Sequence, residues 1–412
     1  MGKQSILIIG TVWVEPNSSA AGSRMLQLIE LFLNQNWHIT FASTSQKNVN
    51  AFDLKAINVA EAFIEVNKPS FDEFIRELQP DIVLFDRFII EEQFGWRVAE
   101  NCPNALRVLD TEDLHFLRKT RYQQLKKGVK FTNEALLKSQ VAKREIASIL
   151  RCDLSLIIST YEMKLLDEVF KIDKKLLYYL PFLLDKVNES QVQNWKPFKQ
   201  RNHFVFIGNF YHKPNVDAIL NLKRNIWSTI RTQLPKAEMH VYGAYMNQQI
   251  QELHHKKEGF MIKGFAENAQ DVVMNAKVVL APLRFGAGIK GKLTEAMICG
   301  TPSVTTSIGA EGMHNHLPWN GCIADEPTAF AKKAIQLYTD EKLWKISQKN
   351  GIQIINEIYD KEKVSDPFIN KILSIQEHLE AHRTQNFLGS LLQHHTLKAT
   401  KYMSKWIESK NA

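Results

Sequence analysis

Short apolar runs alternate with longer amphipathic stretches along most of the chain. The runs are rich in Ile, Val, Leu and Phe, whereas the longer stretches space their apolar residues three and four positions apart. Runs of the first kind are typical of strands buried on both faces, and stretches of the second kind are typical of helices that cover a sheet. The pattern predicts an α/β protein with doubly wound parallel sheets.

The apolar runs fall into two groups, one in each half of the chain. In the first half we predict strands at 5–9, 38–42, 81–85, 105–109 and 154–159. In the second half we predict strands at 203–207, 238–242, 260–262, 278–281, 303–305 and 322–324. Helices are predicted between them, and the first begins near Ala21 and Gly22. Each group suffices for one sheet.

The length and a polar stretch give the domain organisation. A chain of 412 residues exceeds what one hydrophobic core usually organises. Residues 185–202 are polar and lack clear periodicity, which indicates a linker. We predict a Rossmann-like domain at 1–190, a second Rossmann-like domain at 200–375 and a helical tail at 376–412, with the two sheets facing a cleft.

The composition and the apolar runs exclude several classes of protein. With 44% hydrophobic and 23% charged residues, the chain is an ordinary folded protein. No apolar run approaches the roughly 20 residues of a membrane span, and the chain starts directly with a strand pattern, so we expect it in the cytoplasm. Cys102, Cys152, Cys299 and Cys322 are scattered, which favours reduced, buried thiols over a zinc, iron–sulfur or redox motif.

The positive charge is concentrated in one segment. The whole chain carries a formal charge of +8, and residues 117–151 carry the same excess, with ten Lys and Arg against only Glu134 and Glu145. One interpretation is a solvated helical face. The other is contact with an anionic membrane, at the inner face, or with a phosphorylated acceptor. Nucleic acid is not expected, because zinc-finger spacing and RNP-like aromatic motifs are missing from the sequence.

The richest candidate for chemistry follows the predicted strand at 278–281. The sequence APLRFGAGIKGKLTEAMICGTPSVTT places a glycine-bearing loop before a short helix that ends near Gly300. Glycines at a helix start let backbone N–H groups approach a phosphate. The loop and its charged neighbours comprise Arg284, Gly286, Ala287, Gly288, Ile289, Lys290, Gly291, Lys292 and, in the predicted first turn, Glu295. This spacing favours a diphosphate site with a ribose-binding carboxylate over an ordinary glycine turn.

A second polar cluster ends a strand of the first half. The sequence RVLDTEDLHFLR at 107–118 holds Asp113 and His115 among other polar residues. Ligands bind at the carboxyl ends of strands in such sheets, so the cluster predicts a site, although the same residues could cap a helix that begins near Asp113. Asp86 and Arg87 end another strand and are more typical of a structural pair.

The second half resembles the GT-B glycosyltransferases, specifically the retaining group often called family 4. The resemblance rests on FIGNFYHKPNVDAI, VYG, IKGF and RFGAGIKGKLTEAMICGTPSVTT, in that order. It implies that Glu295 is the second carboxylate of a Glu-x7-Glu motif that holds the ribose. It also implies that Gly264 and Phe265 bracket the base, and that Gly208 and Asn209 approach the phosphates.

The resemblance extends to the first half and includes one departure. It implies that His115 lies against the donor sugar with Asp113 as its orienting partner, and that Gly22 and Arg24 belong to a turn beneath the phosphates and acceptor. The first glutamate of the motif is replaced by Ala287. A contact to the sugar ring that many relatives make is therefore missing here.

The expected function is hexosyl transfer from a nucleotide-diphosphate sugar to a glycan or lipid-linked acceptor, with retention, in cell-surface polysaccharide synthesis. We expect no cofactor, and no metal because the sequence has no Asp-x-Asp. Two alternatives stay open: a sugar-nucleotide epimerase of the same fold and a non-catalytic nucleotide-sugar-binding scaffold. A nicotinamide or flavin oxidoreductase is disfavoured, because neither Gly10 nor Gly208 starts a GxGxxG motif.

Overall fold

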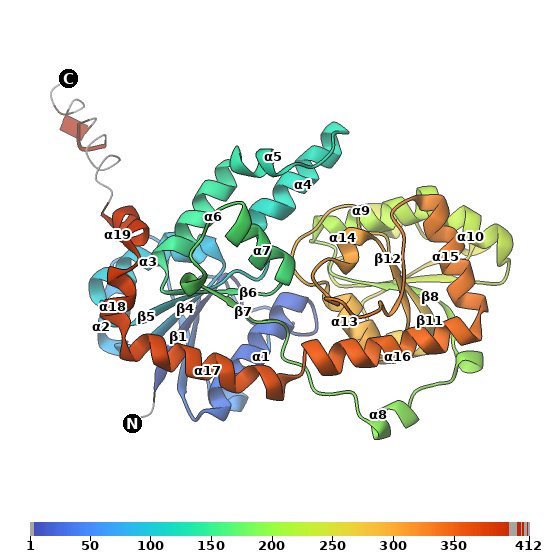
Figure 1. The fold of residues 1–412 in the computed structure, drawn as a ribbon, viewed down its shortest axis with the longest axis horizontal. Coiled ribbons are helices and arrows are strands. Elements are labelled where there is room, and N and C mark those ends of the chain that lie inside the picture. Colours follow the sequence, from blue (N-terminus) through green and yellow to red (C-terminus); the bar gives the residue numbers. More distant parts are fainter. Residues whose placement is uncertain (1–3, 395–401, 405, 408–409, 411–412) are drawn as a thin grey trace.

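Two parallel sheets, each covered by helices, form the protein in a computed structural model (Figure 1). The structure describes residues 4–394, 402–404, 406–407 and 410. The predicted α/β class with two Rossmann-like domains is confirmed. Cys102, Cys152 and Cys299 are buried, Cys322 is half-buried, and all four are free.

The first sheet has seven strands in the order β3-β2-β1-β4-β5-β6-β7, and every neighbouring pair is parallel. Its strands are β1 (Ser5–Gly10), β2 (His38–Ser43), β3 (Ala60–Phe63), β4 (Ile82–Asp86), β5 (Leu106–Asp110), β6 (Leu154–Ile157) and β7 (Leu177–Tyr179). The five predicted strands are present. The two edge strands, β3 and β7, were not predicted.

The second sheet repeats this order with six strands, β10-β9-β8-β11-β12-β13, again all parallel. Its strands are β8 (Asn202–Ile207), β9 (Met239–Tyr242), β10 (Phe260–Gly264), β11 (Ala276–Ala281), β12 (Ser303–Thr305) and β13 (Gly321–Ile323). All six predicted strands of this half are confirmed. In both sheets the order reverses beside the first strand of the half, between β1 and β4 and between β8 and β11, and ligands bind at such switch points.

Seven helices connect the strands of the first domain within residues 4–184. They are α1 (Ala20–Asn34), α2 (Ser70–Leu78), α3 (Phe88–Asn101), α4 (His115–Lys127), α5 (Asn133–Leu137), α6 (Gln140–Arg151) and α7 (Thr160–Glu168). Helix α1 begins after Ser19, whose side chain accepts a hydrogen bond from the backbone N–H of Gly22. Its buried face, with Leu28 and Phe32 fully enclosed, packs on the sheet.

The helices of the second domain surround the second sheet. They are α9 (Lys213–Asn221), α10 (Trp227–Gln233), α11 (Gln248–Gln251), α12 (Ala269–Asn275), α13 (Gly291–Ile298), α14 (Ser307–Ala310), α15 (Pro327–Thr339) and α16 (Glu341–Ile358). A π-helical turn, Leu222–Ile226, joins α9 to α10. Buried aromatic residues such as Phe204 and Trp227 fill the core of this domain.

The chain crosses between the domains twice. The first crossing contains α8 (Glu189–Gln193), and its Val187 and Trp195 are buried in the core of the second domain, so the predicted linker is partly a packed segment. At the second crossing, Leu184 donates to the carbonyl of Tyr359 and accepts from the N–H of Lys361, each at 2.8 Å. The two crossings therefore run side by side.

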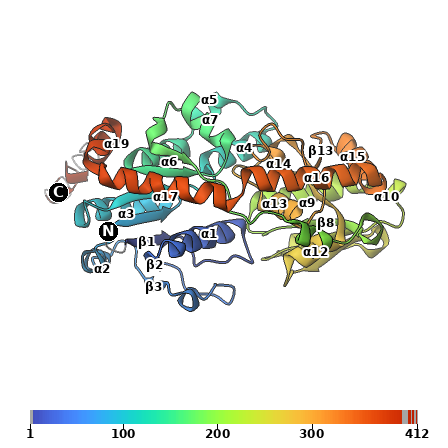
Figure 2. The ribbon, with the colours of Figure 1, turned by 60° about the horizontal axis from the view of Figure 1, so that its bottom comes forward.

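After the second crossing the chain returns to the first domain. It forms α17 (Lys361–Glu377), α18 (Leu379–Thr384) and α19 (Phe387–Gln393), and α16 and α17 lie end to end along both domains in Figure 2. Phe368 and Ile372 of α17 share a core with Ile6 and Ile8 of β1. The second domain thus ends near Ile358, whereas we predicted a boundary at residue 375.

Within the part of the chain that the structure describes, none of the helices combines the length and the apolar character that a membrane span requires.

Candidate active site

The candidate site lies where the carboxyl ends of the two sheets meet. Gly288 and Gly291, from the second domain, sit directly against the first domain. A Cβ added at Gly288 would lie 2.8 Å from the Cβ of Asp113, and one added at Gly291 would lie 2.6 Å from the Cβ of Ala20. Gly288 also has a φ of +63°, a backbone conformation that residues with a side chain rarely adopt. Only glycine allows this loop to approach the opposite domain so closely.

The loop between β11 and α13, hereafter the phosphate loop (residues 284–290), leads into the helix as predicted. Helix α13 begins at Gly291 and ends before Gly300, whose φ is +59°. Glu295 therefore lies in the second turn of α13, and its predicted place in the first turn was wrong. The helix starts five residues after Gly286, the first glycine of the motif, because Gly286 and Gly288 belong to the loop before it.

Two lysines and one carboxylate surround the start of α13. The Nζ of Lys290 donates to the carbonyl of Gly288 at 2.7 Å, and the Nζ of Lys292 donates to Oδ1 of Asn215 at 2.8 Å. Burial lowers the pKa of each lysine to about 8. Burial also raises the pKa of Glu295 to about 7, against the opposing charge of Lys292. An anionic ligand here would raise the pKa of both lysines again and keep them fully charged.

The facing wall comes from the end of β5 and the start of α4. His115 is the first residue of α4, and its Nε2 lies 3.4 Å from Oδ1 of Asp113. Arg118 holds Asp113 with two hydrogen bonds, of 2.6 and 3.1 Å. Burial would raise the pKa of Asp113, but Arg118 and His115 outweigh it and hold that pKa below its ordinary value. Burial lowers the pKa of His115 to about 3, so the ring is neutral near pH 7.

Glu162 joins the two walls and was missed by the sequence analysis. It is fully buried near the start of α7, and its Oε1 accepts hydrogen bonds from the N–H of Leu114 at 3.0 Å and of Gly288 at 2.8 Å. Its Oε2 has no hydrogen-bond partner among the described residues. Burial, aided by the charge of Asp113, raises the pKa of Glu162 to about 7. One carboxylate thus connects the His115 end of α4 to the phosphate loop.

Further contacts hold the domains together. Arg121 of α4 is buried and binds Glu311 of the second domain with two hydrogen bonds, of 2.7 and 2.9 Å. The same guanidinium donates to the carbonyl of Gly286 at 2.9 Å. The hydroxyl of Tyr245 donates to Oε2 of Glu15 at 2.8 Å. These contacts hold the phosphate loop directly against the first domain.

Two buried carboxylates, of Asp86 and Asp110, and the half-buried carboxylate of Glu112 lie deeper on the first-domain wall. Asp86 ends β4, Asp110 ends β5, and Glu112 follows with a φ of +60°. Burial raises the pKa of Asp86 and raises that of Glu112 strongly, and Asp110 adds to both shifts. Oδ1 of Asp86 and Oε1 of Glu112 lack hydrogen-bond partners in the described part of the chain. Such oxygens can accept hydrogen bonds from hydroxyl groups.

Two of the predicted arginines are engaged elsewhere. Arg24 is buried in an ion pair with Asp110 at 3.0 Å and also donates to the carbonyl of Leu180 at 2.9 Å. Arg284 binds Asp217 of α9, and 43% of its side chain is exposed. Neither guanidinium is brought to Lys290 and Lys292. Gly22 shapes the turn near Arg24, since a Cβ there would lie 2.2 Å from the carbonyl oxygen of Glu15.

The other predicted donor-site residues lie along the carboxyl edge of the second sheet. A Cβ at Gly208 would lie 3.4 Å from the Nζ of Lys292. The side chain of Asn209 donates to the carbonyl of Ser18 across the domain boundary at 3.1 Å. Gly264 and Phe265 line a cavity of about 590 Å³ with Tyr245. Within the phosphate loop, Ile289 is buried and Ala287 packs on the core of the first domain.

The basic segment is only partly free. Five of its ten cationic residues form ion pairs: Arg118 with Asp113, Arg121 with Glu311, Lys138 with Glu134, Arg144 with Glu92 and Arg151 with Glu91. The remaining five are exposed: Lys119, Lys126, Lys127, Lys130 and Lys143. In residues 4–394 and the described positions beyond, no three His, Cys, Asp or Glu side chains are grouped to hold a metal ion.

Comparison with known proteins adds a family and a fold. Residues 201–340 match the family model described as Glycosyl transferases group 1. An uncharacterised 44.6 kDa protein in the cps region of Klebsiella pneumoniae is 26% identical over 169 residues, which make up 39% of this chain and 43% of that protein. The match thus spans less than half of that relative.

Solved structures share the architecture over almost the whole chain. Sucrose-phosphate synthase from Thermosynechococcus elongatus superposes with a TM-score of 0.65 at 16% identity, covering 92% of this chain and 100% of that one. A TarM mutant from S. aureus, in complex with Fondaparinux, alpha-GlcNAc-glycerol and UDP, gives a TM-score of 0.69 at 12% identity and covers 89% and 99%. At such identities the likeness shows the fold, which is GT-B.

The match of residues 201–340 and the fold agree with the motifs on which the expected glycosyltransferase class rests. The chain has the GT-B architecture, and residues 201–340 of its second domain match the glycosyl transferases group 1 model.

Proposed function

We propose that the protein transfers a sugar from a nucleotide-diphosphate sugar to a glycan or lipid-linked acceptor in cell-surface polysaccharide synthesis. One observation carries this proposal. The phosphate loop with Lys290, Lys292 and Glu295 faces His115 and Asp113 across the closed domain boundary. The TarM complex with UDP and alpha-GlcNAc-glycerol and the relative in a cps region support the same substrate classes.

The donor would lie with its diphosphate on the second domain. Backbone N–H groups of the phosphate loop and the ammonium groups of Lys290 and Lys292 would bind the phosphates, and Glu295 would accept hydrogen bonds from the ribose. The cavity beside Gly264 and Phe265 is large enough for a nucleobase. The sugar would then point toward His115.

The proposed reaction breaks the bond between the anomeric carbon and the phosphate oxygen and forms a bond from that carbon to the acceptor oxygen on the same face. The acceptor proton goes to the departing phosphate. Negative charge grows on the diphosphate as it leaves, so Lys290 and Lys292 stabilise the transition state more than the ground state. The neutral His115 can bind a sugar hydroxyl without bringing a second positive charge to the developing oxocarbenium ion.

The exposed lysines of the basic segment suit a peripheral contact with the anionic inner surface of a membrane. Each Lys near such a surface contributes about 1 kcal/mol. Lys126, Lys127 and Lys130 are exposed at the end of α4, beyond the residues that pair within the protein. A lipid-linked or anionic acceptor would be reached from this position.

The experiment is a thermal-shift panel with UDP, GDP, ADP and their sugars. A ligand that binds only the folded state raises the unfolding temperature, so we expect one nucleotide family to stabilise the protein, and the Lys292→Ala variant to lose that shift. Incubation with the stabilising donor then separates the alternatives. An altered sugar without an acceptor would indicate an epimerase, and binding without turnover for every acceptor would indicate a scaffold.

A further inference from the structure

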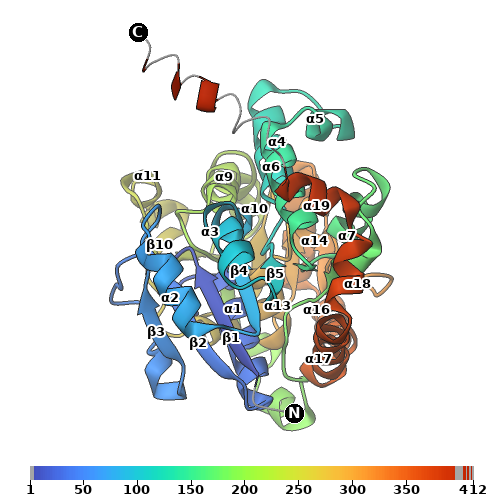
Figure 3. The ribbon, with the colours of Figure 1, turned by 90° about the vertical axis from the view of Figure 1, so that its left-hand side faces the viewer.

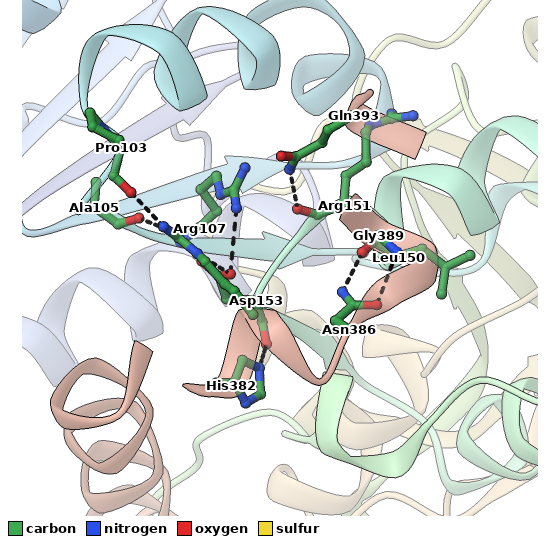
Figure 4. A network of polar contacts seen from close by, with 11 residues as sticks. Pro103, Ala105, Arg107, Leu150, Arg151, Asp153, His382, Asn386, Gly389 and Gln393 are labelled. Carbon is green, nitrogen blue, oxygen red and sulfur yellow. Dashed lines mark hydrogen bonds and ion pairs between the residues drawn. The ribbon is translucent and has the colours of Figure 1, made fainter. Parts of the chain in front are cut away.

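Helix α19 presents its polar and small residues to the protein. The side chain of Asn386 accepts from the N–H of Gly389 at 3.0 Å and donates to the carbonyl of Leu150 at 2.7 Å (Figure 4). Gln393 donates to the carbonyl of Arg151 at 3.2 Å. A Cβ at Gly389 would lie 2.2 Å from the Leu150 oxygen. The face formed by residues 386, 389 and 393 is therefore packed tightly on the end of α6.

The opposite face of α19 is apolar and exposed. Phe387, Leu388 and Leu391 are 72%, 59% and 51% exposed. We call these three residues the α19 patch. A surface helix normally buries its apolar face and exposes its polar one, so this arrangement is inverted. Clustered exposed apolar side chains of this kind mark a contact surface.

The preceding helix fixes α19 on the first domain. Arg383 of α18 binds both carboxylate oxygens of Asp153, at 2.8 and 2.7 Å, and donates to the carbonyl of Ala105 at 2.7 Å. His382 lies 2.8 Å from the carbonyl oxygen of Asp153 (Figure 4). Arg383 thus binds the carboxylate of Asp153, and His382 contacts its backbone carbonyl. These contacts fix α18, and so they fix the α19 patch on the surface of the first domain.

A second apolar group follows in the chain. Tyr402, Met403, Trp406 and Ile407 are 64%, 57%, 54% and 47% exposed, at the spacing of one helical face. The sequence from 395 to 412 contains four lysines and a single acidic residue, Glu408. Trp and Tyr together with Lys are typical of segments that lie in the interface of a bilayer.

The basic segment faces the same way. Figures 1 and 3 show the α4–α5 end and α19 on the upper side of the first domain, with α17 on the lower side. Lys126, Lys127 and Lys130 are exposed at the α4 end. One side of the first domain therefore carries both the α19 patch and the exposed lysines at the α4 end. Together they suit an anionic membrane surface.

We propose that the α19 patch and the apolar group at 402–407 insert into the interface of an anionic lipid bilayer, while the lysines at the α4 end bind its headgroups. This inference deepens the proposed function, because it assigns the surface that would hold the enzyme at a membrane acceptor. Charge argues against a second copy of the chain as the occupant, since a symmetric contact would bring identical lysine-rich surfaces together. The three residues of the patch are also few against the roughly 800 Å² per partner of a stable interface.

The test is co-sedimentation of the full chain with vesicles of phosphatidylcholine alone or mixed with phosphatidylglycerol. We expect binding to the mixed vesicles. The triple variant Phe387→Ser, Leu388→Ser, Leu391→Ser should weaken it by about tenfold or more, because apolar burial in the interface is lost. The matched control is Phe63→Ser, which removes an aromatic ring that is 57% exposed from edge strand β3 and should bind as the unaltered chain does.

Added salt distinguishes the apolar contribution to vesicle binding from the electrostatic one. The triple variant Lys126→Glu, Lys127→Glu, Lys130→Glu should abolish the preference for phosphatidylglycerol, whereas the serine variant should become fully sensitive to added salt. Thermal stabilisation by the nucleotide should be the same in all variants, so failure here is distinguishable from failure of the proposed function. Unchanged vesicle binding by the serine variant would overturn the inference. So would light scattering that shows a dimer dispersed by the same substitutions.

Discussion

The two walls of the cleft differ in charge and in how they are built. The second-domain wall is a single continuous segment in which glycines, Lys290 and Lys292 gather within a few residues. The first-domain wall is assembled from the ends of β4 and β5 and the starts of α4 and α7. It carries carboxylate oxygens, on Asp86, Glu112 and Glu162, that have no hydrogen-bond partner among the residues that the structure describes. One wall suits phosphates, and the other suits hydroxyl groups.

This division explains why Ala287 is tolerable in the phosphate loop. Glu162 brings a carboxylate to Gly288, the next residue, from the opposite domain. A carboxyl group that titrates near pH 7 therefore lies beside the loop without belonging to it. Closure of the domains, rather than the loop sequence alone, determines the charge that a bound sugar would meet.

The largest expected effect is on the positive wall. Lys292→Ala should lower turnover about a hundredfold, because a preorganised donor to the leaving diphosphate is lost. The measurement is the steady-state transfer rate with the donor found in the thermal-shift panel. Lys257→Ala, an exposed lysine in the turn before β10, is the matched control and should keep full activity. A normal rate in Lys292→Ala would remove the lysine from the mechanism.

The next largest effect tests the link between the walls. Glu162→Ala leaves the N–H groups of Leu114 and Gly288 without their acceptor, so kcat/KM should fall about tenfold. Glu162→Gln keeps an oxygen in the same place and should stay within about threefold of the unaltered enzyme. If Gln proves as damaging as Ala, the charge of Glu162 matters and the acceptor alone does not.

A smaller effect concerns the carboxylate on the positive wall. Because the pKa of Glu295 rises from 4.5 to about 7 on folding, the folded protein keeps a proton that the unfolded chain releases, and the free energy of unfolding should fall as the pH rises through this window. Glu295→Gln should remove about 1 kcal/mol of that fall, after allowance for partial solvent screening. Urea unfolding on either side of the window measures it. If the free energies of unfolding of the two proteins change with pH in the same way, the raised pKa of Glu295 is contradicted.

The smallest effect separates a surface ion pair from the phosphate site. Arg284 binds Asp217 and is 43% exposed, and such pairs contribute about 0–1 kcal/mol. Arg284→Ala should therefore change kcat/KM by less than about threefold. A loss near that of Lys292→Ala would mean that Arg284 leaves Asp217 for the donor, and the positive wall would then be larger than the structure indicates.

The contrast between the walls also explains what the sequence could predict. The phosphate loop was recognisable because its glycines and lysines are contiguous and their spacing has a chemical meaning. Glu162 lies 126 residues from its partner Gly288, and a lone glutamate near a helix start carries no sign of such a contact. The resemblance predicted Arg24 beneath the phosphates, but its ion-pair partner Asp110 lies 86 residues away in the sequence and could not be predicted from it.

The fold shows the same limit. Central strands such as β1 and β4 are buried on both faces and read as apolar runs, whereas the edge strand β3, with the sequence AEAF, is half-exposed and too polar to stand out. The apolar spacing of α17 predicts one buried face. It does not say which of the two domains that face will meet.

The return of α17 means that the first domain is encoded in two separate pieces of the gene. A fragment that stops at residue 190 would leave the β1 side of its core bare, without Phe368 and Ile372. Because Leu184 and Lys361 are hydrogen-bonded neighbours, joining residues 4–184 to 361–394 through a few glycines would give a self-contained unit. The proposed acceptor side could then be studied in isolation from the proposed donor side.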